Sequence, residues 1–168
     1  MGNLVSNEQI GDKSRLKMSN GATSVFVSLL SLATSRIAAT ENQILLSTCI
    51  ASCDQSVFGL GIVGFDLADL PWTRDEEEFA KEKNFLISSI ERVISRSDWG
   101  ELDYTPSVDR ALHNQRIFLE MVNLFQLENV QEFNQSNFRL PEPLGETCQK
   151  HGVYLHIAGC VICHDTAQ

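Results

Sequence analysis

Three cysteines and one histidine near the C-terminus have the spacing of a metal site. They form two pairs, each with two intervening residues, and eight residues separate the pairs. Structural zinc takes four Cys or His ligands at the corners of a tetrahedron. A two-residue gap lets one tight turn direct both side chains at an ion, and eight residues suffice for a hairpin that returns the second pair to the first. The spacing therefore predicts a closed, structural zinc site formed by Cys148, His151, Cys160 and Cys163.

The residues around these ligands strengthen the prediction. Gly152 and Gly159 each follow or precede a ligand, where a turn often needs positive φ. The pattern Cys-x-x-His-Gly, then an aromatic residue and later Cys-x-x-Cys, resembles the short zinc-knuckle, treble-clef-like modules of bacterial and phage proteins. This resemblance covers residues 148–163 only. It implies a structural Cys3His site and carries nothing about the rest of the chain.

Other interpretations of the cysteines stay open at this point. Residues 160–164 read Cys-x-x-Cys-His, the attachment pattern of c-type haem, but that use needs export and leaves Cys148 and His151 unexplained. Redox-active or unligated cysteines are a further alternative. His156 and His164 are spare histidines that could replace a ligand, although we expect them at the surface.

The remaining candidates for chemistry are weaker. Cys49 and Cys53 lie four residues apart on one expected helix face and are interpreted as core residues. Gly59, Gly61 and Gly64 match the dinucleotide-binding spacing, yet no strand signal precedes them and Pro71 follows where the helix should run. We expect residues 57–70 to form a buried loop or short strand.

Several carboxylates flank the two tryptophans and could belong to an enzyme site near the Gly-rich segment. We expect most of them to lie in solvated loops, because paired carboxylates are not recognisable from sequence alone. They are Asp66, Asp69, Asp98, Glu101 and Asp103.

Apolar periodicity predicts a mostly α protein with a C-terminal zinc-knuckle hairpin. One helical stretch covers 24–53, with a break where Thr40 and Gln43 could form a capping box. A second helix is predicted from Thr73, capped with Glu76, to about Ser97.

A third helix is predicted from Ser107 to about Leu127, and an extended connection over 129–147. The chain is thereby divided into a flexible leader (1–22), a helical domain (23–140) and a zinc-binding tail (141–168).

Charge, cysteine count and hydropathy limit the classes of function that the chain can have. A net charge of -9 opposes nucleic-acid binding, because no run of basic residues offsets it. Five cysteines, an odd number, fit a reducing and therefore cytoplasmic compartment better than a disulfide framework. No apolar run reaches the ~20 residues that span a bilayer. A signal peptide ahead of residues 25–33 and N-myristoylation at Gly2 are two minor alternatives.

Acidity, small size and a closed metal site favour a protein-binding module with a basic protein partner. The chain is similar in size and acidity to toxin-neutralising immunity proteins, a resemblance that no motif carries. An enzyme with its site near residues 57–70 and a nucleic-acid-binding zinc protein are the alternatives.

Overall fold

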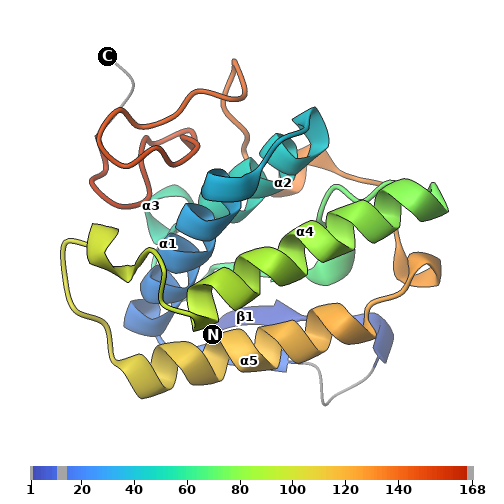
Figure 1. Cartoon of the computed structure of the whole chain (residues 1–168), viewed down its shortest axis with the longest axis horizontal. Coiled ribbons are helices and arrows are strands. Elements are labelled where there is room, and N and C mark those ends of the chain that lie inside the picture. Colours follow the sequence, from blue (N-terminus) through green and yellow to red (C-terminus); the bar gives the residue numbers. More distant parts are fainter. Residues whose placement is uncertain (1, 11–14, 166–168) are drawn as a thin grey trace.

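The computed structural model describes residues 2–10 and 15–165 and confirms a mostly α fold with a small sheet (Figure 1). The α-helices are α1 (Asn20–Ile37), α2 (Glu41–Ser52), α3 (Gln55–Phe58), α4 (Glu76–Ile94) and α5 (Val108–Leu124). The strands are β1 (Asn3–Ser6), β2 (Arg15–Met18) and β3 (Gly64–Asp66). Single 3-10 turns cover Glu8–Ile10, Leu67–Asp69, Trp99–Glu101, Leu127–Asn129 and Gln135–Asn137.

Helix α1 is the centre of the molecule and contacts α2, α4 and α5. Its sequence is apolar or small on nearly every face, so ten of its residues are buried, from Thr23 to Thr34. A helix surrounded in this way needs few charges, and the only one it carries is Arg36 in the last turn. The side chain of Phe118 in α5 completes this core, with its ring edge-on to those of Phe26 and Phe65.

The three strands form one sheet in the order β2-β1-β3. β1 pairs antiparallel with β2, and parallel with β3. The parallel pair approaches closely at Gly64, where an added Cβ would lie 2.8 Å from the carbonyl oxygen of Leu4. Gly64, one of the three glycines with the dinucleotide-binding spacing, therefore allows close backbone packing. Residues 57–70 contain the short strand β3, as expected.

The expectation of a flexible leader over residues 1–22 is wrong for most of its described residues. Asn3–Ser6 and Arg15–Met18 are strands, and α1 already begins at Asn20. Alternation in β2 is visible in the sequence, since Leu16 and Met18 are buried while Arg15 and Lys17 are exposed. Four residues are too few for a reliable period-2 signal, and the partner strand β3 lies far along the chain.

The helix boundaries follow from their caps. The predicted break is present, because the Thr40 side chain accepts from the backbone N–H of Gln43 and starts α2. The predicted start at Thr73 is wrong: Asp75 is the N-cap and accepts from the N–H of Glu78. The backbone N–H of Thr73 donates instead to the buried carboxylate of Glu82, 2.8 Å away. Helices α4 and α5 end at Ile94 and Leu124, three residues earlier than expected.

Candidate metal centre

The four predicted ligands meet at one point. One ligand atom from each residue lies within 4.8 Å of the other three. The Sγ of Cys148 is 3.7 Å from the Sγ of Cys163 and 3.7 Å from Nδ1 of His151, which is also 3.7 Å from the Sγ of Cys160. Tetrahedral zinc with Zn–S bonds of about 2.3 Å separates its ligand atoms by roughly 3.5–3.8 Å. The cluster is therefore the size of a site that could hold one metal ion.

Both pairs use the same turn. The N–H of Gly152 donates to the carbonyl of Cys148 at 2.7 Å, and the N–H of His164 donates to that of Cys160 at 2.8 Å. The residue after each second ligand has a left-handed backbone, with φ 63° at Gly152 and φ 59° at His164. Gly159, the glycine that the sequence pairs with Gly152, also has positive φ (109°). The true counterpart of Gly152 in the second turn is His164.

A short hairpin joins the two turns. Thr147 forms an isolated antiparallel bridge with Tyr154, and His156 forms another with Gly159. These bridges return the second pair of ligands to the first, as the eight-residue spacing predicts. Cys148, His151 and Cys160 are buried, and Cys163 is partly exposed.

The thiols influence one another strongly. Burial is the largest cause that raises the pKa of Cys163, and together with the neighbouring Cys148 and Cys160 it brings that pKa to about 12. Burial also raises the pKa of Cys148, but hydrogen bonds from the backbone of His151 and Lys150 outweigh it and leave that pKa below its usual value. The N–H of Ile162 points at the Sγ of Cys160, 3.4 Å away. Three crowded thiols with backbone donors form a donor set that a soft divalent cation would complete.

The hairpin is attached to the helical body through a buried histidine. Nε2 of His156 lies 3.0 Å from Oδ2 of Asp54, and the N–H of Ala158 donates to Nδ1 of the same ring. Because Nδ1 accepts, Nε2 carries the proton and donates to Asp54. The expectation that His156 is a surface residue is wrong, since it is 2% exposed. Its role is to connect the tail to the N-cap of α3.

Apolar contacts and a further hydrogen bond extend this attachment. Val153 and Val161 are buried and belong to the main hydrophobic core. The backbone N–H of Tyr154 donates to Oγ of Ser35 in α1, 3.1 Å away. The tail is therefore packed on the body from both turns.

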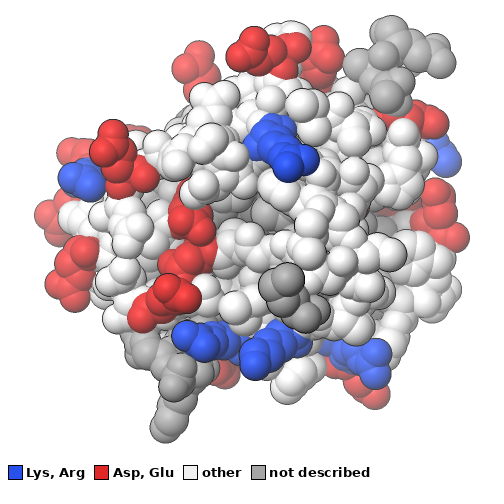
Figure 2. All heavy atoms as spheres, turned by 180° about the vertical axis from the view of Figure 1, so that it is seen from behind, with Lys and Arg blue, Asp and Glu red and all other residues white. Residues whose placement is uncertain are grey.

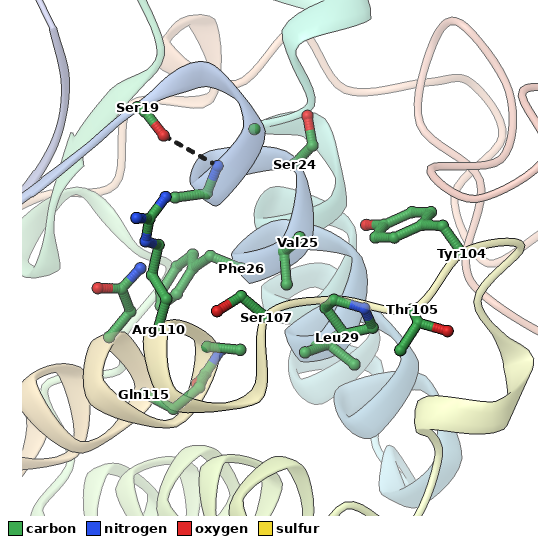
Figure 3. Close-up of a pocket in the computed structure, with 15 residues that line it drawn as sticks. Ser19, Ser24, Val25, Phe26, Leu29, Tyr104, Thr105, Ser107, Arg110 and Gln115 are labelled. Atoms are coloured by element: carbon green, nitrogen blue, oxygen red, sulfur yellow. Dashed lines mark hydrogen bonds between the residues drawn. The ribbon is translucent and has the colours of Figure 1, made fainter.

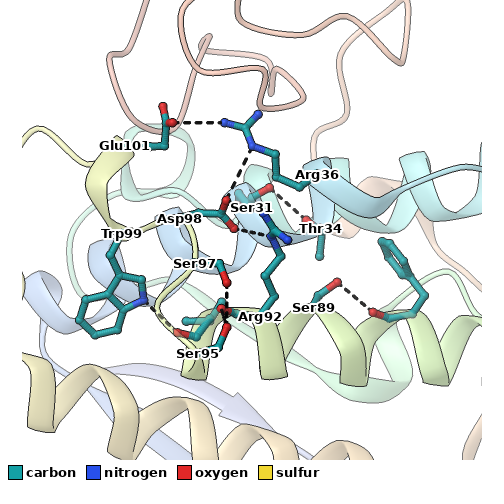
Figure 4. Close-up of polar contacts among 12 residues, drawn as sticks. Ser31, Thr34, Arg36, Ser89, Arg92, Ser95, Ser97, Asp98, Trp99 and Glu101 are labelled. Atoms are coloured by element: carbon teal, nitrogen blue, oxygen red, sulfur yellow. Dashed lines mark hydrogen bonds and ion pairs between the residues drawn. The ribbon is translucent and has the colours of Figure 1, made fainter.

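A polar network next to the tail joins the ends of α1 and α4 (Figure 4). The guanidinium of Arg92 donates two hydrogen bonds to the carboxylate of Asp98, with lengths of 2.6 and 2.9 Å. Arg36 lies 3.8 Å from both Asp98 and Glu101. The guanidinium of Arg36 also borders the first metal turn, because an added Cβ on Gly152 would lie 2.7 Å from it. Asp98 is thus a buried structural anion, contrary to the expectation of a solvated carboxylate.

The other predicted residues have structural positions. Cys49 and Cys53 are buried in the core, as predicted, and burial raises the pKa of Cys53 to about 12. Asp66 and Asp69 form a capping box around the turn Leu67–Asp69. Asp66 also accepts from Ser6 and from the N–H of Glu8, which fastens β3 to β1.

Comparison with protein-family models, curated proteins and solved structures found no match to this chain. The fold and the site define it as a small, mostly helical protein with a C-terminal Cys3His cluster. Within residues 2–10 and 15–165, none of the helices combines the length and apolar character that crossing a bilayer requires.

Proposed function

We propose that this chain is a protein-binding module stapled by a structural zinc ion, and that it binds a basic protein as a toxin-neutralising immunity-type protein does. The observation that carries the zinc assignment is the size of the four-ligand cluster, with three separations of 3.7 Å. Three cysteine sulfurs and one imidazole nitrogen are donors that bind zinc in preference to magnesium or calcium. Four protein ligands leave no coordination position for a substrate, so the ion would act through stability.

The proposed binding surface is the exposed acidic start of α4. Asp75 and residues 76–78 present four consecutive carboxylates, all exposed. Lys81 pairs with Glu77 and Glu78 at 2.9 and 2.8 Å and neutralises only part of this charge. A cluster that keeps a net negative charge attracts basic partners and speeds their association.

The acidity of the sequence also makes the carboxylates of residues 98–109 candidate contributors, but those of residues 98–103 are less suited to this role. Asp98 is held by two arginines inside the molecule. Glu101 faces Arg36, and Asp103 lies 3.8 Å from Lys150. The proposed acidic surface is therefore confined to α4.

Binding experiments with neutralised variants test this function. The triple variant Glu76→Gln, Glu77→Gln and Glu78→Gln removes three charges but keeps Asp75, the helix cap. A matched control replaces three exposed carboxylates elsewhere by Gln: Glu128, Glu132 and Glu142. Circular dichroism of both variants checks that the fold is kept.

A pull-down from the native host is performed at low salt and at about 0.5 M salt, where charge steering is screened. We expect one basic protein to be retained by the wild type and the control, and to be lost with the α4 variant and at high salt. A partner held unchanged by the α4 variant would refute the acidic surface. Turnover of a small molecule that stops when Asp66 and Asp69 are replaced would favour the enzyme alternative instead.

A further inference from the structure

A second feature, far from the metal centre in sequence, has the properties of a small-molecule site. A cavity of about 410 Å³ lies between the first half of α1 and the start of α5, beside residues 104–107 (Figure 3). Its apolar wall consists of Val25, Phe26, Leu29 and Ala111. The volume falls within the range of roughly 300–1,000 Å³ that ligand pockets occupy. No Asp or Glu is among the described residues that line it.

The cavity contains a buried amide without a hydrogen-bond partner. Gln115 lines the cavity and is 1% exposed, and neither Oε1 nor Nε2 has a partner among the described residues. Burying an unpaired amide is unfavourable, because the group loses its hydrogen bonds to water without replacement. Gln115 can both donate and accept, so a polar group on a bound molecule would satisfy it.

The opposite side of the cavity is positive. The first turn of α1 borders it through Ser19, Gly21 and Ala22. Ser19 already caps the N–H of Ala22, while the N–H of Gly21 has no partner within the described part of the chain. The space next to Gly21 is open, since nothing lies within 4 Å of a Cβ placed there. Helix α1 has 18 residues, so its N-terminus carries the partial positive charge that favours anions.

Arg110 adds a full charge at the same place. Figure 3 shows its side chain extending from α5 towards the first turn of α1. A second cavity of about 420 Å³ shares Ser19, Ala22, Arg110 and Asn114 with the first. Arg15 and Lys17 also line it, and again no Asp or Glu does among the described residues.

The basic residues Lys17 and Arg110 at these cavities contrast with the net charge of -9 of the whole chain. Figure 2 shows Lys and Arg side chains in a row along the lower edge of the face turned away from Figure 1. Cavity walls of one sign raise the local concentration of ligands with the opposite charge.

We propose that these adjoining cavities bind a small organic anion with an apolar body. Arg110 and the first turn of α1 hold the anionic oxygens, Phe26 and Leu29 contact the apolar body, and Gln115 pairs with a polar group on that body. The proposed anion site rests on neither the metal centre nor the proposed protein binding. It can therefore be wrong while they are right, and right while they are wrong.

A fluorescent probe of this chemistry tests the site in the full-length, metal-loaded protein. Anilinonaphthalene sulfonate combines an anionic head with an apolar body, and N-phenylnaphthylamine is its neutral analogue. Benzoate and phenyl phosphate, added as competitors, distinguish a carboxylate from a phosphate head group. Amide chemical shifts measured during the titration locate the bound probe.

Two arginines of α5 give a matched pair of variants. Arg110→Ala removes the proposed contact, whereas Arg116→Ala removes an exposed arginine that lines neither cavity. We expect one saturable site, shift changes at Gly21, Ser24 and Gln115, and weaker binding on the order of ten- to a hundredfold in Arg110→Ala only. The neutral analogue should bind less tightly, and one of the two competitors should displace the probe.

Equal affinity of both arginine variants, or shift changes confined to the exposed Leu60 and Ile62, would overturn the proposal. No saturable binding of any anionic probe up to about 1 mM would do the same. Gln115→Leu provides a separate check, since it removes the unpaired amide and should raise the melting temperature of the free protein. A lower melting temperature would show that the amide is needed by the fold and would overturn its assignment to a ligand.

Discussion

Replacing Cys160 by Ser tests how the metal centre supports the rest of the molecule. The variant removes one of the four proposed ligands, at a residue with no exposed surface. Apparent binding free energies of structural zinc reach about 10–16 kcal/mol, far more than the hairpin gains from its two isolated bridges. We therefore expect residues 146–165 to lose their structure when the site is broken.

The effect on the helical body can be worked out from the contacts that the tail makes with it. Val153 and Val161 are buried in the main core, and each contributes about 1.5–3 kcal/mol through burial. The free energy of unfolding of the body would fall by about 3–6 kcal/mol. This loss is smaller than, or close to, the lower end of the roughly 5–15 kcal/mol that is usual for the free energy of unfolding of a domain. For a chain of this size, that loss corresponds to a fall in melting temperature of roughly 6–24 °C.

Thermal unfolding followed by far-ultraviolet circular dichroism measures this effect. We expect Cys160→Ser to keep most of its helical signal at room temperature but to melt earlier, as wild type should after chelation. Gln149→Ala is the control, because this exposed residue lies between two ligands without being one. A melting temperature within about 2 °C of wild type would refute the coupling between tail and body. Complete loss of helix at room temperature would show that the tail is part of the cooperative core.

The other predictions concern the metal, the second turn, one buried carboxylate and the core. Elemental analysis should find one zinc per chain, and fewer than about 0.3 after metal-replete expression would contradict the site. His164→Gly should raise the free energy of unfolding by up to about 1 kcal/mol in denaturant titrations, because its left-handed backbone suits glycine; a destabilised variant would contradict the turn geometry. Burial raises the pKa of Asp54, but hydrogen bonds from His156 and Ser56 outweigh it and lower that pKa overall. The stability that Asp54 adds over Asp54→Asn should therefore be present above its unfolded pKa of about 3.9 and vanish as pH falls through the folded value; a pH-independent difference would refute this. Phe118→Ala should cost about 3–5 kcal/mol in the same titrations, whereas Leu124→Ala, 52% exposed, should cost less than about 0.5 kcal/mol.

Local features of the chain were readable from sequence because their causes are local. The two-residue spacing of the ligands and the glycine after His151 depend only on a single turn each. Thr40 breaks the first helical stretch through a hydrogen bond to a residue three positions away. The apolar face of α5, with Phe118 at its centre, follows from the helical spacing of apolar residues within that one segment of sequence.

The tertiary structure decided what depends on residues far apart in the chain. The strands at residues 3–6 and 15–18 are too short to show a pattern, and β1 is held from its other side by β3. The buried pair of Asp54 and His156 spans 102 positions, and nothing in the local sequence of either residue indicates the other.

The basic cavity has the same origin. Lys17 comes from a strand and Arg110 from a helix far along the chain, so the sequence does not show that they lie close together. Their charges add only where packing places β2 beside α5. Electrostatic fields sum over distance in space and not along the chain, and an acidic sequence can therefore fold into a protein with a positive cavity.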